Sequence, residues 1–417
     1  MHAPGSRPGL SAHTIDRRDL LTGALLFVAA ALVLVPLTGL LDRLGAYERL
    51  DILFNADSKG ALQEMTTGTG LRARSVSHPL YHVLIGYPVK YLVLAVAALL
   101  RQPAGEIARH FIYVTPLVAA ALTTLLYATL RRFCASRAAC LLAAIFFAAG
   151  FAMLVFGSIL EHFLLSGFLI AAAFAAALHM VARRTFSRLF WIGAAFLCGA
   201  ITVTNLVPIG ILFLLHAIYV GRPAIRDALV ISLTSVALLA GAMVATHYLV
   251  QDYNLGGPSM PEKYLVADYM DRLVHIPDFL VNAVAPSAVA LEPTDHGTGF
   301  TLNGVRSAIS LPGLALLVML TLSAHAWLRS RDRTFRFAMA AAALVVAFNL
   351  VFHSFWGDEV FLYAPHYIFM QGFLLLAWLH VAGAGLAAAV LVPATALVIA
   401  ANHASLRYVL GTIGTLL

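Results

Sequence analysis

Carboxylates and histidines of this chain lie in short polar segments between long apolar runs. Asp57, Glu161 and Glu359 each stand within a few residues of such a run, and His162 directly follows Glu161. A carboxylate at hydrogen-bond distance from a hydroxyl group can orient it and take its proton as it attacks. Carboxylate and imidazole ligands also suit a divalent metal ion, but no local spacing fixes three of them. These residues predict acid–base chemistry, with a divalent metal left open as a cofactor.

Basic residues gather on the C-terminal side of Asp57. Arg72, Arg74, His78 and Lys90 cluster around the start of the apolar run at 80–100. Arginine binds phosphate in a bidentate manner, and a cation beside a phosphate leaving group stabilises the negative charge that develops there. Ordinary anionic lipid head groups also favour basic residues at a membrane surface, so lipid contact stays open as the alternative for each of the four.

Composition places the chain in a membrane. Hydrophobic residues make up 61% of it and charged residues 11%, and the mean hydropathy is +0.87. So little polar surface cannot cover a water-soluble globule. The net charge of +7 comes largely from arginines in short loops beside apolar runs, where orienting the chain in a bilayer explains them better than a nucleic-acid partner does.

Counting apolar runs with the positive-inside rule gives a topology. The run at 80–100 contains His82, Pro88 and Lys90, which suit an interfacial or re-entrant segment better than a lipid-exposed span. If that run does not cross, every short arginine-rich loop faces the cytoplasm. We therefore predict an all-α polytopic membrane protein with eleven spans, one interfacial juxtamembrane helix at 80–100 and a cytoplasmic N-terminus. The spans are expected near 20–41, 111–130, 138–156, 163–182, 189–205, 206–220, 228–249, 307–328, 337–353, 363–382 and 385–401.

The predicted outer side carries most of the acids. The pair at 189–220 barely provides two crossings, and a tight turn through Thr202, Thr204 and Asn205 would join them.

The chain is expected to form a single transmembrane domain, 1–417, without internal repeats. Its outer segments are 42–109, 157–162, 251–306 and 354–362.

The order of three motifs resembles the GT-C superfamily of membrane glycosyltransferases. An acid follows the first span (Asp57), an arginine-containing stretch leads into His78-Pro79-Leu80-Tyr81, and a second acid stands in the next outer turn (Glu161). The pattern is most similar to the protein O-mannosyltransferase and lipid A aminoarabinose transferase branch. It departs from that branch at His78, where a lysine-proline-proline run would be expected, and this puts the phosphate contact at that position in question.

The resemblance implies a GT-C-like fold and a glycosyltransferase activity. Such an enzyme takes a sugar from a polyprenyl-phosphate-linked donor and places it on a glycan, lipid or protein acceptor at the periplasmic face of a bacterial inner membrane. Asp57 would then be the base or the acid that orients the acceptor, with Glu161 second, and Arg72, Arg74, His78 and Lys90 would bind the donor phosphate. A transporter or flippase for lipid-linked saccharides is the alternative.

Each candidate acid also has a structural interpretation. Asp57 can simply cap a juxtamembrane helix, and Glu161 with His162 can be a solvated turn. A helix starting near Asp358 would place Glu359, Tyr363 and His366 on one face at i, i+4 and i+7, where they would contact the substrate. The same segment also fits an aromatic belt that anchors a span.

Overall fold

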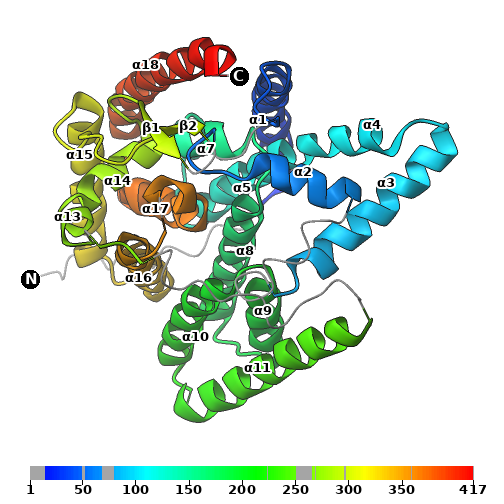
Figure 1. Cartoon of the computed structure of the whole chain (residues 1–417). Helices are drawn as coiled ribbons and strands as arrows, with labels where there is room; N and C mark the ends of the chain where they lie inside the picture. The colour runs from blue at the N-terminus through cyan, green and yellow to red at the C-terminus, as the bar shows by residue number, and fades with distance from the viewer. Residues whose placement is uncertain are drawn as a thin grey trace, which may run out of the picture.

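The computed structural model describes residues 15–48, 52–67, 79–222, 224–249, 265–267, 269–294, 297–357 and 359–416. Within these ranges the chain forms helices and one two-stranded antiparallel sheet. Figure 1 shows most of the helices grouped around α8 (His162–Arg183), with α2 (Ser58–Thr67), α3 (Tyr87–Leu100) and α4 (Ala104–Arg109) extending to one side. The predominance of apolar helices agrees with the polytopic all-α class predicted from composition.

Eight helices of the described residues are long and apolar enough to cross a membrane. They are Arg17–Arg43 (α1), Ala104–Arg131 (α4, Ala104–Arg109; η3, His110–Tyr113; α5, Val114–Arg131), His162–Arg183 (α8), Val203–Val220 (η4, Val203–Asn205; α10, Leu206–Val220), Ile225–Tyr248 within α11 (Ala224–Leu249), Leu311–Arg329 (α15), Arg333–Phe355 (α16) and Ala384–Leu416 (α18). A pair bent by 71° would make a ninth span, formed by Val360–His366 (η5) and Ile368–His380 (α17, Ile368–Leu376; η6, Ala377–His380).

Each of the eleven predicted spans contains a helix, but not every one is long enough to cross by itself. The run at 138–156 divides at Gly150 into α6 (Arg137–Ala148) and α7 (Phe151–Phe156). The run at 189–205 becomes α9 (Arg188–Ile201), which has 14 residues. At 1.5 Å per residue such a helix spans about 21 Å, short of a ~30 Å hydrocarbon core. The number of crossings therefore stays a prediction.

Helices α9 and α10 run antiparallel. At one end Thr202 shares a hydrogen bond with Ser166 at 3.1 Å, and Asn205 Nδ2 donates to the same Ser166 hydroxyl at 3.1 Å. At the other end the His216 ring contacts the carbonyl oxygen of Thr185 at 2.9 Å. The chain therefore reverses direction at the predicted turn. Two separate crossings require this reversal, whereas one broken helix would continue in the same direction.

The arginine-rich loops lie together at one end of the bundle. Asp19, near the start of α1, accepts hydrogen bonds from Arg131 Nε at 2.8 Å and Arg137 Nε at 2.9 Å. Nearby, Arg188 Nε donates to Asp227 Oδ1 at 2.7 Å. Helix α8 also ends among these loops. Its last residue, Arg183, lies close enough to Arg132 for the two positive charges to repel each other. This end is called the basic end below.

Polar residues begin helices at both ends. Side chains that accept from backbone N–H groups of the first turn satisfy donors that would otherwise be unpaired in an apolar setting. At the basic end the caps are Asp16, Ser136, Ser187 and Asp332. At the opposite end, here called the acidic end, the caps are Glu161, Ser310 and Glu359.

The predicted juxtamembrane run, 80–100, forms a π-helical turn, His82–Gly86 (η2), followed by α3 (Tyr87–Leu100). Helix α3 packs against α4 through Val93 and Ala97, and with α2 (Ser58–Thr67) it projects beside the bundle (Figure 1). Its other faces expose Tyr91, Leu92 and Leu99. The interfacial placement of this apolar helix stays a prediction.

The segment 251–306, interpreted from sequence as a long loop, contains regular structure. It holds α13 (Tyr269–Val274), α14 (Ile276–Val284), β1 (Ala290–Thr294) and β2 (Gly297–Thr301). The strands pair from Ala290 opposite Thr301 to Thr294 opposite Gly297. Helix α14 reaches into the bundle, where Gln371 Nε2 donates to its Leu280 carbonyl oxygen at 2.6 Å. The pure-loop interpretation was therefore incomplete, because short strands and a short helix give little periodic signal.

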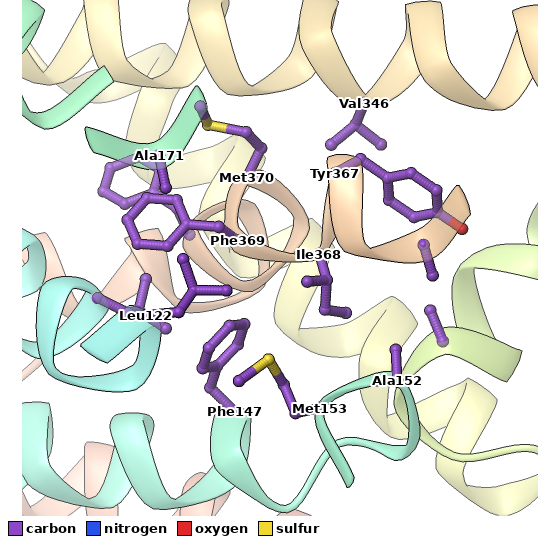
Figure 2. Packing of buried hydrophobic residues seen from close by; sticks show 14 of the residues in the cluster. Leu122, Phe147, Ala152, Met153, Ala171, Val346, Tyr367, Ile368, Phe369 and Met370 are labelled. Carbon is purple, nitrogen blue, oxygen red and sulfur yellow. The ribbon is translucent and has the colours of Figure 1, made fainter. Parts of the chain in front are cut away.

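The core surrounds the bend between η5 and α17. Figure 2 shows Ile368, Phe369 and Met370 of this region packed among side chains of neighbouring helices, including Phe147 and Met153. Helix breaks expose backbone carbonyls, and here polar side chains satisfy them. Asn402 Nδ2 of α18 donates to the carbonyl oxygens of Ala149 at 2.6 Å and Val284 at 2.8 Å.

Candidate functional site

The loop that carries Asp57 is held in a strained conformation. Phe54 and Asn55 both have left-handed backbone angles, with φ of 55° and 57°. Such angles are uncommon in residues other than glycine and persist only where the surroundings enforce them. Here Phe54 N donates to the Phe300 carbonyl of β2 at 2.9 Å, and Phe300 N donates back to Ile52 at 2.9 Å. The buried Phe54 ring also packs edge-on against Phe361, with centroids 4.9 Å apart. Contacts with strand β2 and η5 therefore hold the backbone that leads into Asp57.

Asp57 lies at the start of α2 and caps it. Its Oδ1 accepts a hydrogen bond from Gly60 N at 3.2 Å, and its carbonyl oxygen accepts one from Ala61 N at 2.9 Å. The structure thus confirms that Asp57 caps a helix, as its structural interpretation predicted. The side chain is half-buried, so its carboxylate is near the surface as well as at the cap.

Glu161 meets Asp57 across 104 positions of sequence. Its Oε2 accepts the hydrogen bond of Asp57 N at 3.1 Å. Its Oε1 accepts from His162 N at 2.9 Å and also contacts His162 Nδ1. The residue is 6% exposed and caps α8. The structure therefore brings three predicted site residues together and engages both carboxylate oxygens of Glu161.

An aromatic cluster continues from His162 into the bundle. The His162 ring lies 4.1 Å from that of Phe163 and 5.4 Å from that of Tyr81, between centroids. Phe163 in turn lies 5.2 Å from both Tyr363 and His366. Two further predicted site residues, Tyr363 and His366, thus share one cluster with His162.

His353 belongs to this cluster and was missed from sequence. Its ring stacks on Tyr363 with centroids 3.7 Å apart and planes within 6°. It lies near the end of α16 and is 2% exposed. A single histidine inside an apolar run is usually a core residue, and only its position in the last helical turn, at the acidic end, could have marked it.

The segment after Glu359 forms a 3-10 helix rather than an α-helix. The prediction that Glu359, Tyr363 and His366 share an α-helical face was wrong, because Glu359 is the N-cap and Pro365 removes one N–H donor inside the segment. Tyr363 and His366 still face the same side, since residues three apart align in a 3-10 helix. Gly167 of α8 permits the close approach, because a Cβ there would collide with the Pro365 carbonyl group.

Glu359 joins the sheet to this helix. Thr301 Oγ1 of β2 donates to Glu359 Oε2, and Phe361 N donates to Oε1 at 3.3 Å. Burial raises the pKa of Glu359 to about 7, with the Thr301 hydrogen bond acting in the opposite direction. Just before it, Gly357 has a φ of +103° and its carbonyl oxygen accepts from Arg272 Nη1 at 2.6 Å. A side chain at Gly357 would overlap the Tyr363 ring.

Of the four residues predicted to bind phosphate, the structure describes Lys90. Lys90 lies in α3 and is half-buried. Arg72, Arg74 and His78 fall outside the described residues. Among the residues that are described, no group of three or more histidines, cysteines or acids is arranged to hold a metal ion.

Segments far apart in the chain therefore meet at the acidic end. The first outer segment contributes Asp57, the turn before α8 contributes Glu161, the sheet contributes Thr301, and the segment before η5 contributes Glu359. Comparison with family models, curated proteins and solved structures finds no match to this chain. What the site can do must be argued from its own residues.

Proposed function

We propose that the chain is a membrane glycosyltransferase that moves a sugar from a polyprenyl-phosphate-linked donor to a glycan, lipid or protein acceptor. The observation that carries the proposal is the meeting of Asp57 with Glu161 at the end of the bundle opposite the arginine-rich loops. Because basic loops favour the cytoplasmic side, the acidic end would face the periplasm in a bacterial inner membrane. A lipid-linked donor is the form in which a sugar reaches that side.

Asp57 is the residue best suited to act on the acceptor. Its carboxylate is half-buried and lies near the surface, whereas Glu161 is buried and caps α8. As the acceptor oxygen bonds to the anomeric carbon, the bond from that carbon to the phosphate oxygen breaks and the electron pair leaves with the phosphate. The hydroxyl proton passes to the Asp57 carboxylate.

Glu161 is proposed as a positioning residue. It holds the Asp57 backbone through Oε2 and the His162 ring through Oε1. Its own contribution would be to fix the distance between the base and the aromatic cluster that includes Tyr363 and His366. Misplacing a base costs rate because proton transfer needs hydrogen-bond geometry.

The leaving phosphate needs cations. Lys90, with Arg72, Arg74 and His78, is proposed to meet it where the projecting α3 would lie at the membrane surface. Arginine and lysine beside a developing phosphate charge lower the barrier because that charge is larger in the transition state. Contact with other anionic lipids is the competing role for the same residues.

Two substitutions at one position separate chemistry from capping. Asn caps helices about as well as Asp but cannot accept the proton, while Ala loses both roles. Purified protein in detergent would be given a labelled polyprenyl-phosphate sugar and an acceptor. We expect Asp57→Asn to lower transfer by about 10²-fold or more with little change in stability. Glu106→Gln, an exposed acid of α4 in the same outer segment, is the matched control and should retain activity.

Full transfer by Asp57→Asn would refute the role given to that carboxylate. If the unmodified protein consumes no lipid-linked donor of any sugar tried, the activity itself is refuted.

A transporter or flippase for lipid-linked saccharides is the second candidate. The 71° bend between η5 and α17 and the break at Gly150 favour it, since discontinuous helices at mid-depth are typical of transport sites. The carboxylates of Asp57, Glu161 and Glu359, however, lie at the acidic end of the bundle, although His366 stands at the bend itself. Donor consumption in detergent, where there is no second compartment, decides between the two.

A further inference from the structure

Helix α18 carries one charged side chain in an otherwise apolar sequence. It has 33 residues, and Arg407 is the only Arg, Lys, Asp or Glu among them. At 1.5 Å per residue the helix is about 50 Å long, more than a ~30 Å hydrocarbon core requires. Figure 1 shows it at the edge of the molecule, beside α15 and the two strands, and its exposed residues show that the described part of the chain leaves one of its sides uncovered.

Arg407 lies on that uncovered side. Val392, Ile399, His403 and Arg407 follow one another at spacings of seven and four, which place them on one helix face. All four are exposed. Asn402 points the other way, into the bundle, where it bonds two backbone carbonyls. The side with Val392 and Ile399 is therefore the side that lipid would cover.

A hollow of about 490 Å³ opens around Arg407. It is lined by His403, Ala404, Arg407, Tyr408, Gly411 and Thr412. Ala404 and Gly411 leave space between the larger side chains, and a Cβ on Gly411 would meet nothing within 4 Å. The lining thus combines a guanidinium group, an imidazole and two hydroxyls with room beside them.

Within the part of the chain that the structure describes, the Arg407 guanidinium has no ion pair or hydrogen bond. A basic side chain toward one end of a lipid-facing helix side reaches the depth of the head groups, where it attracts anionic lipids. Guanidinium and hydroxyl groups together match the oxygens of a phosphate.

The hollow lies toward the acidic end of the bundle. Tyr408 packs edge-on against Phe300 of β2, with centroids 6.1 Å apart. The next residue of that strand, Thr301, donates to Glu359. A head group held by Arg407 would therefore lie in the membrane leaflet nearest the candidate site, on the outer side of the sheet that holds the Asp57 loop.

We propose that His403, Arg407, Tyr408 and Thr412 bind the phosphate of an anionic phospholipid on the lipid-facing side of α18. The occupant is a lipid because apolar side chains flank the hollow along the same face, where acyl chains can lie. This site is independent of the glycosyltransferase proposal, since it involves none of the residues assigned to sugar transfer.

Native mass spectrometry of the purified full chain in detergent tests the site. The protein would be titrated with phosphatidylglycerol and, separately, with phosphatidylcholine. We expect Arg407→Gln to weaken phosphatidylglycerol binding about ten- to hundredfold, as for a lost charged hydrogen bond. Binding of phosphatidylcholine should change little. Arg101→Gln, an exposed arginine after α3, is the control and should bind like the unmodified protein.

A second variant leaves every charge in place. Gly411→Leu fills the hollow, and the open space there means that the helix should fold normally. It should weaken phosphatidylglycerol binding as well. Unchanged binding in both variants would overturn the proposal, and so would displacement of the lipid by excess inorganic phosphate, which would indicate a soluble anion. Loss of a dimer in Arg407→Gln, without loss of lipid, would instead identify a second copy of the chain as the occupant.

Discussion

Replacing Glu359 with Gln should change how stability depends on pH. In the folded protein burial raises the pKa of this carboxyl to about 7, from 4.5 in the unfolded chain. Between these pH values the unfolded chain loses the proton while the folded protein keeps it, so the free energy of unfolding falls as pH rises. Below pH 4.5 both states are protonated, and above about pH 7 both are ionised, so the Glu359 contribution is constant there.

The size of the effect follows from the shift. A change of roughly 2.5 pKa units corresponds to about 3 kcal/mol of stability lost across this window. The Gln variant cannot ionise. Its one side-chain oxygen can accept from Phe361 N, and its amide N–H can donate to the Thr301 hydroxyl, which donates to the carboxylate of Glu359. Its stability should therefore lack this decline and exceed that of the unmodified protein near pH 7.

Thermal unfolding in detergent at a series of pH values would measure this. The loss of the helical circular-dichroism signal on heating reports unfolding at every pH of the series. Glu292→Gln in β1 is the control, because that acid is exposed in the same hairpin. If the stability of Glu359→Gln changes with pH in parallel with that of the unmodified protein from pH 4.5 to 7, the raised pKa assigned to the buried Glu359 carboxyl is wrong.

Further predictions concern packing and the basic end. Gly167→Ala should destabilise the fold by at least 1–3 kcal/mol through its clash with Pro365, as overpacking does, whereas Gly193→Ala, with nothing within 4 Å of the new Cβ, should be neutral or slightly stabilising in the same thermal assay. Asp19→Asn should cost about 3 kcal/mol, because it leaves the buried Arg131 without its countercharge; a melting temperature equal to that of the unmodified protein would contradict this.

The class of fold was readable from sequence because it depends on local patterns. Long apolar runs predict helices whatever their neighbours are, and each predicted run does contain one. The polar segments were placed correctly between helices for the same reason. Helix α18 extends beyond the predicted limit at 401 because Asn402 and His403 interrupt the apolar run but not the helix.

The arrangement of the site depends on contacts that no local pattern encodes. That Asp57 lies beside Glu161 was an expectation from motif order, and the residues between them give no distance. The hairpin was missed because strands of five residues with Pro293 in one of them carry almost no alternation signal. The 3-10 geometry after Glu359 depends on packing against Gly167, which lies far away in sequence.

The most direct test of the central claim is the side of the membrane on which Asp57 lies. A single cysteine at position 59 (Lys59→Cys), two residues from Asp57, would be labelled in intact cells with a membrane-impermeant maleimide, while the buried native cysteines stay unreactive. A cysteine in place of Arg184, exposed at the basic end, is the opposite marker. We predict labelling at position 59 in intact cells and at position 184 only after the membrane is opened. Labelling at 184 but not at 59 in intact cells would put the candidate site on the cytoplasmic side and contradict the proposed chemistry.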